Sequence, residues 1–333
     1  MHIPDNYLSP STCAVMAAAM LPVWRWAGRR VKQQLTRKKM PLLGVGAAFS
    51  FLIMMVNLPL PGGTSGHAVG AALAAILWGP AFAVLSTSAA LVIQALVFGD
   101  GGILAYGANC FNMAFVMPMV AFALFRLIAG RFGSPRGKAA AAFLAGYVSL
   151  NAAAFLTAVE FGLQPLLFAD SAGRPLYGPY GLDIAVPAMM IPHLLVVGIV
   201  EGLVTAGVYR YVSKASPGLI YGGSRLSLKK AWAFLGALLA LTPVGLLAAG
   251  TAWGEWGTDE VGGMLGYIPE GMRRGFAWKA PLPDYSLVSL HAVGGYLLSA
   301  AVGALLLGAA AWLVMKRLPA KAAKPDGAER GHE

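Results

Sequence analysis

The stretch that decides the fold is residues 287–315, LVSLHAVGGYLLSAAVGALLLGAAAWLVM, which contains no Asp, Glu, Lys or Arg. A helix of about 20 apolar residues crosses the roughly 30 Å hydrocarbon core of a bilayer, so this run predicts a membrane-spanning helix. The whole chain shares its character, because 58% of the 333 residues are hydrophobic and 12% are charged. Soluble domains carry about 25% charged residues. We therefore expect an all-α polytopic membrane protein.

The same pattern recurs along the rest of the chain. Nine apolar runs predict about nine transmembrane helices, at residues 9–26, 41–60, 66–79, 80–98, 103–127, 138–163, 184–212, 229–250 and 287–315. The run 66–79 is short, since a helix of its length rises only about 21 Å. We expect part of it to lie inside the bundle, where backbone polarity is tolerated.

The net charge of +11 is concentrated in a few segments. Residues 25–39, 126–138, 209–230 and the tail from Lys316 together hold 21 of the 25 basic residues. Lys and Arg accumulate on the cytoplasmic loops of membrane proteins, so this distribution points to a lipid bilayer and excludes nucleic acid as the expected partner. It predicts an amino terminus outside and a cytoplasmic carboxyl terminus.

The main alternative for residues 1–26 is a cleaved signal peptide. Such a leader has a charged start, then a short apolar stretch, then small residues at the cleavage site. Here the start is acidic and contains proline, and the positive charge follows the apolar run. We expect this segment to be a retained first helix.

The amino terminus itself, MHIPDNYLSP (1–10), carries a set of metal-binding groups. The amine of Met1, the deprotonated amide nitrogen of His2 and the His2 imidazole can close two chelate rings around one ion. Three nitrogens in a plane suit square-planar Ni(II) or Cu(II), whereas Zn prefers a tetrahedron and Mg or Ca prefer oxygen. Among the five histidines, His67 follows a Pro/Gly turn on the same side as Met1, so we expect it to supply the fourth nitrogen. The alternative is a structural, hydrogen-bonded histidine.

Four segments resemble the CbiM/NikM family, the substrate-binding (S) components of energy-coupling factor ABC transporters for nickel and cobalt. They are MHIPDNYLSPSTC (1–13), GGTSGHAVGAALAAILWGP (62–80), QALVFGDGGILAYGANCFNMAFVMP (94–118) and HLLVVGIVEGLVT (193–205). The resemblance implies that Met1, His2 and His67 hold a transported Ni(II) or Co(II), with no permanent cofactor. Family members usually have Gly where this chain has Asn6, and Asn tolerates a positive φ best among the other residues.

The third motif (94–118) contains three further polar residues, Asp100, Asn109 and Asn112. Asp100 belongs to an outer turn, and Asn109 and Asn112 lie one helical turn apart below it. Amides at i and i+3 share a helix face, so we expect these three residues to orient the metal-binding loop through hydrogen bonds rather than to ligate. The alternative is that the two asparagines join helices to one another.

Two further polar residues fall inside a predicted membrane helix. Glu201 is costly in hydrocarbon and should face the bundle interior, and His193 lies about two turns before it. We expect both to hold helices together or to respond to gating. The alternative is a place for them on the transport path.

The last third of the chain differs from the rest. We expect residues 1–213 to form the metal-binding S component, 214–228 a cytoplasmic linker, 229–318 a two-helix part and 319–333 a cytoplasmic polar tail. Two helices flanking an outer loop, residues 251–286, resemble the NikN/CbiN-type accessory subunit, here fused. The acidic residues of the loop could contact the metal site, and the alternative is a solvated loop.

No phosphate-binding loop of the form G-x-x-x-x-G-K-[ST] occurs, so we do not expect this chain to hydrolyse ATP. The resemblance implies partners, namely a transmembrane coupling subunit and two cytoplasmic ATPase subunits, in a bacterial or archaeal cell membrane. Two other classes stay open. One is a passive channel or secondary carrier, and the other is an intramembrane metalloenzyme built on His67, His193 and Glu201.

Overall fold

The computed structural model describes residues 1–34, 40–61, 63–215, 228–248, 250–287 and 290–317. Over these residues the chain is almost entirely helical, with one two-stranded sheet. The elements are α1 (Pro10–Gln34), α2 (Met40–Met54), β1 (Leu58–Leu60), β2 (Thr64–Gly66), α3 (Ala71–Trp78), α4 (Pro80–Ile93), α5 (Tyr106–Asn109), α6 (Met117–Ala129), α7 (Pro135–Leu167), α8 (Leu182–Pro192), α9 (Gly198–Ala215), α10 (Leu228–Leu241), α11 (Thr258–Leu265), α12 (Glu270–Arg273) and α13 (Ala292–Arg317). Most of the expected linker and the whole polar tail from 319 lie outside the described residues.

Several helices continue without a break into turns of another pitch. The π-helical segments are Gln94–Phe98 after α4, Cys110–Val116 between α5 and α6, and His193–Val197 between α8 and α9. A 3₁₀ turn, Thr242–Leu247, extends α10, and another, Pro283–Tyr285, precedes α13. π-Helical turns are rare and occur often at functional sites.

Five helical segments of the described chain are long and apolar enough to cross a membrane: Pro80–Phe98, Tyr106–Ala129, Pro135–Leu167, Leu182–Ala215 and Ala292–Val314. Two shorter apolar helices, Pro41–Met54 and Ala231–Leu247, accompany them. The chain is therefore a helical multi-pass membrane protein, as the composition predicts. Nine crossings and the orientation of the chain stay predictions.

Two expected helices differ from the observed ones. The second expected helix (41–60) ends early, because α2 stops at Met54 and the proline-containing stretch after it forms an antiparallel hairpin, β1–β2. The short expected helix (66–79) begins only at Ala71, and its eight residues rise about 12 Å. Residues Ala71–Leu77 are all buried, so α3 lies inside the bundle and is too short to cross a membrane.

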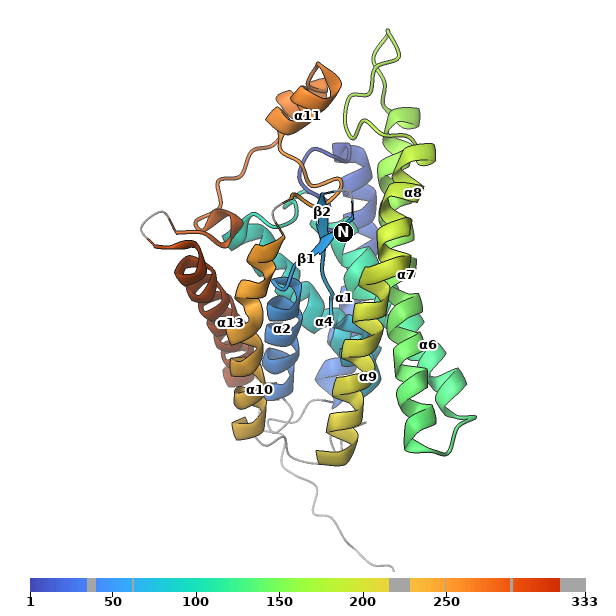
Figure 1. The fold of residues 1–333 in the computed structure, drawn as a ribbon, viewed down its shortest axis with the longest axis vertical. Coiled ribbons are helices and arrows are strands. Elements are labelled where there is room, and N and C mark those ends of the chain that lie inside the picture. The colour runs from blue at the N-terminus through green and yellow to red at the C-terminus, as the bar shows by residue number, and fades with distance from the viewer. Residues whose placement is uncertain (35–39, 62, 216–227, 249, 288–289, 318–333) are drawn as a thin grey trace, which may run out of the picture.

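The long helices form two groups (Figure 1). Helices α6–α9 pack together on one side, and α10 and α13 pack on α2 at the other, with α1, α3 and α4 between them. Gly303 of α13 permits the close contact with α2, since a Cβ there would lie 2.1 Å from the Phe51 ring. Small residues commonly allow such close helix approach in membranes.

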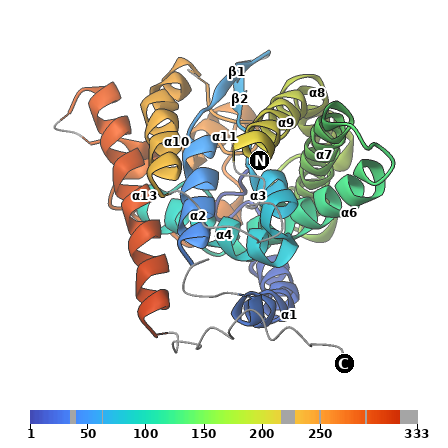
Figure 2. The same ribbon diagram turned by 90° about the horizontal axis from the view of Figure 1, so that it is seen from below.

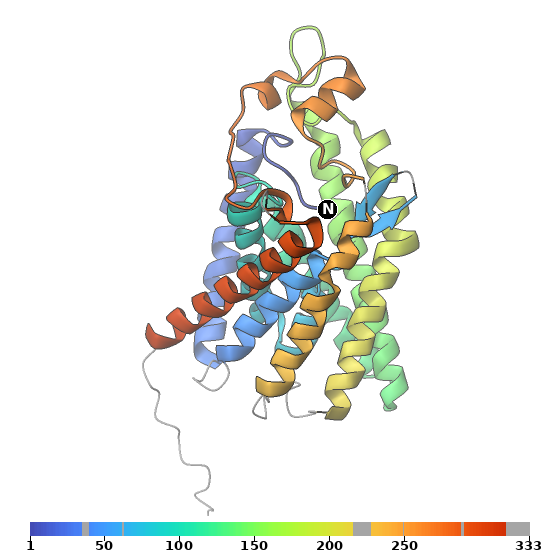
Figure 3. The same cartoon turned by 60° about the vertical axis from the view of Figure 1, so that its left-hand side comes forward.

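The two ends of the bundle differ in what they carry. The hairpin, α11 and the loops around them gather at one end, with the amino terminus below them inside the bundle (Figures 1 and 3). At the opposite end lie the last turns of α6, α9 and α13, which contain basic residues. Seen from below, the first residues lie near the middle of the helices (Figure 2). The fold thus surrounds the chain's own beginning.

Candidate metal centre

The amino-terminal segment, residues 1–9, is the inner wall of the candidate site. It runs without regular structure before α1 begins at Pro10, and the side chains of Met1, Ile3, Tyr7 and Leu8 are buried. Met1 is 4% exposed and His2 is 1% exposed. A chain end placed so deeply needs partners for its backbone groups, because buried unpaired N–H and C=O groups are costly.

Asn109 supplies two of these partners. Its Oδ1 accepts from the backbone N–H of Ile3 at 2.8 Å, and its Nδ2 donates to the Ile3 carbonyl at 3.0 Å. The carbonyl of Ile3 also accepts from the N–H of Gly102 at 2.8 Å. The end of α5 therefore holds the peptide directly after His2. The role of Asn109 in orienting metal ligands stays a prediction.

Asp5 fastens the same segment to the loop before α5. Its carboxylate accepts from the backbone N–H groups of Ile103 and Leu104 at 2.9 and 2.7 Å. Gly102 is required here, since a Cβ on it would lie 2.5 Å from the Asp5 nitrogen. The sequence motifs 1–13 and 94–118 thus meet as one hydrogen-bonded unit.

Asn6 turns the chain toward the outer loop of the carboxyl-terminal third. Its φ is 69°, a positive value that Asn tolerates better than other non-Gly residues do. Its side-chain amide exchanges two hydrogen bonds with the backbone of Phe276, at 2.8 and 2.9 Å. Tyr7 adds a further link, because its hydroxyl donates to the carbonyl of Trp256 at 2.9 Å.

The hairpin places His67 against His2. His67 follows β2 directly, is 6% exposed, and its Nε2 lies 3.3 Å from Nδ1 of His2, with ring centroids 5.0 Å apart. Its Nδ1 lies 3.1 Å from the carbonyl of Ala68. When Nδ1 donates to that carbonyl, Nε2 keeps its lone pair, and that lone pair faces the ring of His2.

The electrostatics of the pair favour a neutral His67. Its pKa lies well below the ordinary value of 6.5, first because burial disfavours the charged ring, and then because His2 and the amino terminus are close. The hydrogen bond to Ala68 opposes this shift. A neutral imidazole is the form that ligates a metal.

Glu201 on α9 holds the loop that carries His67. Its Oε2 accepts from the N–H groups of Val69 and Gly70 at 2.8 and 3.1 Å, and the residue is fully buried. Gly70 has a φ of 75°, and a Cβ there would lie 2.5 Å from the Phe49 ring. The carboxylate also sits at the amino end of α3, where a negative charge is favourable. Glu201 therefore fixes where the loop ends and α3 begins.

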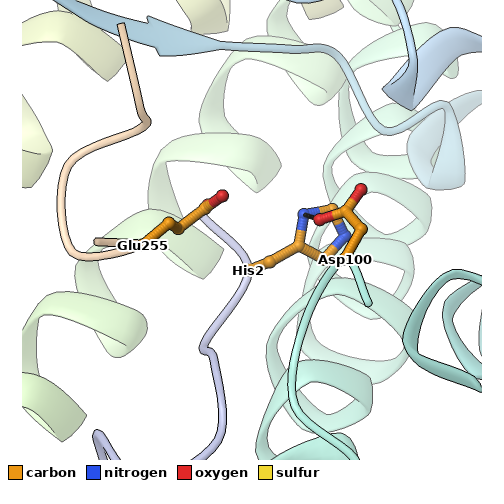
Figure 4. Close-up of side chains that lie close together, drawn as sticks. All are labelled: His2, Asp100 and Glu255. Carbon is orange, nitrogen blue, oxygen red and sulfur yellow. Dashed lines mark ion pairs between the residues drawn. The ribbon is translucent and has the colours of Figure 1, made fainter. Parts of the chain in front are cut away.

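Two carboxylates complete the site around the first two residues. Oε1 of Glu255, from the outer loop 251–286, lies 3.1 Å from the terminal nitrogen of Met1. Oδ1 of Asp100 lies 3.1 Å from Nδ1 of His2. Figure 4 shows Glu255 pointing toward the His2 ring from one side, with the carboxylate of Asp100 against the ring. Asp100, expected only to orient the loop, thus contacts the imidazole itself.

Two side chains hold the carboxylate of Asp100 through its second oxygen, Oδ2. Its Oδ2 accepts from the Tyr285 hydroxyl at 2.5 Å and from the Gln94 side chain at 3.1 Å, and Gln94 is fully buried. Tyr285 belongs to the turn before α13, so the carboxyl-terminal third supports both carboxylates. Oδ1 of Asp100 is the oxygen left for His2.

A cavity of about 380 Å³ leads to these groups. Its lining includes His67, Asp100 and Glu255 together with Asp284, and both the first part of the chain and the outer loop contribute to it. A hydrogen bond joins the hairpin to the outer loop, since the Thr64 hydroxyl accepts from the N–H of Trp253 at 2.7 Å.

Two of the residues singled out in the sequence, Asn112 and His193, do not contact the amino-terminal segment in the hydrogen bonds of the described residues. Asn112 does not reach the amino-terminal loop, because its amide donates to Thr157 and Glu160 of α7 at 3.1 and 2.9 Å. The π-helical pitch of Cys110–Val116 separates residues three apart by a wider angle than an α-helix does. His193 is buried, and its Nδ1 lies 2.7 Å from the carbonyl of Met189 one turn earlier. Both have interior structural contacts.

Sequence reasoning missed two contributors, Asp5 and Tyr285, and it indicated Glu255 only as one member of the acidic outer loop that could contact the metal site. Asp5 was visible in the first motif, where a carboxylate beside a proline turn can accept backbone hydrogen bonds. Glu255 was one of five acidic residues in the outer loop, and nothing local distinguishes it from the others. Tyr285 carries no sequence signal, since its role depends on a turn far from Asp100.

Two family models match the chain. Residues 2–219 match the family described as cobalt uptake substrate-specific transmembrane region, and residues 229–319 match the PDGLE domain. A crystal structure of a truncated transition metal transporter is 52% identical, with a TM-score of 0.61, and the match covers 65% of this chain and 99% of that one.

Several known proteins are similar over most of their length. The fused nickel transport protein NikMN of Rhodobacter capsulatus is 49% identical over 329 residues, which cover 92% of this chain and 95% of that protein. The probable fused nickel transport protein LarMN of Lactiplantibacillus plantarum is 45% identical over 315 residues, with the same coverage. The cobalt transport protein CbiM of Geobacter sulfurreducens is 32% identical over 274 residues, covering 78% of this chain and 75% of that protein.

Proposed function

Because the chain belongs to the CbiM family of cobalt uptake substrate-specific transmembrane regions and carries a PDGLE domain after it, we propose that it is the metal-binding subunit of an importer for Ni(II) or Co(II). The names of its relatives support metal transport rather than an enzymatic activity. We place nickel first, since the two most similar relatives described above are fused nickel transport proteins.

The observation that carries this proposal is the pairing of His67 with His2 beside the terminal amine. Nε2 of His67 and Nδ1 of His2 lie 3.3 Å apart, and both nitrogens belong to buried rings. We propose that the amine of Met1, the amide nitrogen of His2, its Nδ1 and the Nε2 of His67 bind the ion. Four nitrogens in one plane suit Ni(II), and Co(II) follows it closely in affinity order.

Around this site the protein replaces the water shell of the ion with fixed nitrogen atoms. Asn109 holds the chain directly after His2, and Glu201 holds the loop directly after His67. Groups of this kind orient metal ligands and set their tautomers. The rigid supports lie on different helices, so a relative movement of α5 and α9 would separate the ligands and release the ion.

The energy for that movement must come from outside the chain. We propose an energy-coupling factor complex, in which a transmembrane coupling subunit and two cytoplasmic ATPase subunits act on this protein. Residues 1–213 would be the S component, and 229–318 the fused accessory part, which closes over the site through its outer loop. The basic helix ends would then face the cytoplasm, and the metal site the exterior.

The test is nickel titration of the purified chain with its native amino terminus, following the d–d absorption band of square-planar nickel. We expect one ion per chain, and loss of the band after His67→Ala or after addition of one residue before Met1. His291→Ala is the matched control, since His291 is exposed at the start of α13. An unchanged band in either site variant, with the fold intact, would overturn the ligand assignment. ATP-dependent uptake into vesicles that contain the partner subunits tests the coupling.

A further inference from the structure

The cavity beside His67 is lined by two carboxylates, Asp100 and Glu255, which the four-nitrogen site does not use and which lie beside one of its ligands, His2. One ligand atom each from His2, Asp100 and Glu255 lie within 4.8 Å of one another. The side chains of Asp100 and Glu255 are each 19% exposed, whereas His2 is 1% exposed. The two carboxylates are therefore more accessible from the cavity than the ring of His2.

This donor set differs in chemistry from the nitrogen plane. Carboxylate oxygens bind hydrated divalent cations and tolerate several waters in the coordination shell. The nitrogen plane requires a deprotonated amine and a deprotonated amide, so it forms only after protons leave. A site of two oxygens and one imidazole can hold the ion while it still carries water.

The carboxylates are positioned rather than free. Asp100 receives hydrogen bonds on Oδ2 from Tyr285 and Gln94, which leaves Oδ1 directed to His2. Glu255 is held beside the amine of Met1 at 3.1 Å. The donors come from three distant segments of the chain, and the set is complete only when the outer loop lies on the first part.

From these contacts we propose that Asp100, Glu255 and Nδ1 of His2 form a receiving site for a hydrated divalent cation, with the two carboxylates lining the cavity. The ion is held there first and then passes to the terminal amine, the amide and His67. This inference rests on the proposed metal-binding function. It assigns to the fused carboxyl-terminal part a direct role in metal capture, through the carboxylate of Glu255.

Manganese is the probe, because Mn(II) prefers oxygen donors and does not form the planar nitrogen complex. We expect the wild-type protein to bind one Mn(II), with pulsed electron paramagnetic resonance showing coupling to one histidine nitrogen. That signal should persist in His67→Ala, since His67 is not part of the set. A wild-type protein without nitrogen-coupled manganese would overturn the receiving site.

Variants then test the two carboxylates. Asp100→Asn and Glu255→Gln keep hydrogen-bond acceptors for Tyr285 and for the amine, and they remove the charge. In each, manganese binding should be lost, and the planar nickel band should appear about tenfold more slowly at low ionic strength, because charged clefts raise association rates by at least that factor. Asp259→Asn is the matched control, since Asp259 is an exposed acidic residue of the same outer loop. Manganese binding and nickel capture equal to wild type in both site variants would also overturn the proposal.

The two proposals fail in different ways. A wild-type chain that binds manganese through one histidine and shows no planar nickel band contradicts the four-nitrogen site. A chain that shows the nickel band and has no nitrogen-coupled manganese contradicts the receiving site alone. Both readouts come from the unmodified protein, so they do not depend on whether any variant folds.

Discussion

Nε2 of His67 lies 3.3 Å from Nδ1 of His2, although 65 residues separate them in the sequence. The position of each ring depends on hydrogen bonds from residues that are distant in the sequence. Asn109 holds the peptide after His2, and Glu201 holds the peptide after His67. The distance between the two nitrogens is therefore set by the positions of α5 and α9, which is why changes outside the ligand set should alter metal affinity.

Glu201→Ala should weaken nickel binding by about 10- to 100-fold, which is the usual effect of removing a group that orients a metal ligand. The substitution leaves the N–H groups of Val69 and Gly70 without their acceptor, at a cost of about 1–3 kcal/mol for each buried group. Calorimetric titration measures the affinity, and thermal unfolding measures the stability.

Glu201→Gln should restore most of that affinity, because a side-chain carbonyl can still accept from both N–H groups. Glu160→Gln is the control, since Glu160 lies in α7 and contacts Asn112 rather than the His67 loop. Equal nickel affinity in wild type and Glu201→Ala would show that the loop keeps its place without the carboxylate.

The two asparagines of the third motif should respond differently to substitution. Asn109→Ala removes both hydrogen bonds to Ile3, so we expect faster amide hydrogen exchange in residues 2–5 and nickel affinity at least about tenfold lower. Asn112→Ala removes contacts with α7 alone, so it should lower the melting temperature and leave the affinity unchanged. Equal affinity losses in the two variants would contradict this division.

Much of the helical framework follows from hydrophobic patterning. The runs 80–98, 103–127, 138–163, 184–212 and 287–315 all correspond to observed membrane-length helices within a few residues, because a long, predominantly apolar run has few other stable forms in lipid. The short run 66–79 could not be assigned in the same way. The N–H groups that precede its buried eight-residue helix donate to Glu201, which lies far away in the sequence, so local periodicity does not show where this helix begins.

The site was predictable where its chemistry is local and unpredictable where it is tertiary. The chelating start, Met1 and His2, and the position of His67 after a proline-rich turn are visible in the sequence, and the structure brings them together. The sequence indicates Glu255 only as one of several acidic residues of the outer loop, and only the path of that loop selects it among them. Asn112 is turned away by a π-helical segment that helical periodicity cannot reveal.

Asn6 should tolerate Gly better than Ala. Both substitutions remove the two hydrogen bonds to Phe276, and only Ala adds the cost of a side chain at a φ of 69°. That cost is about 1–2 kcal/mol for a left-handed L-residue. Thermal unfolding should therefore rank wild type above Asn6→Gly, and Asn6→Gly above Asn6→Ala. An Ala variant as stable as the Gly variant would mean that the turn changes conformation.

The stability of the metal-free protein should fall in mild acid because of His67. Its pKa in the folded state lies well below 6.5, so below about pH 6.5 the unfolded chain binds a proton at this residue that the folded chain does not. Unfolding then becomes easier as the pH falls, and at one pH unit below that value this group alone costs about 1.4 kcal/mol. Above it the contribution vanishes, since both states are neutral.

The measurement is the melting temperature of metal-free wild type and of His67→Gln between about pH 7.5 and pH 5.5, a range that brackets the unfolded-state titration. Gln cannot be protonated there, so wild type should lose more stability than the variant across this range. A parallel fall in both proteins would assign the acid sensitivity to other groups. The same depressed pKa keeps the Nε2 lone pair of His67 available in mild acid, so protonation of His67 should not weaken nickel binding in this range.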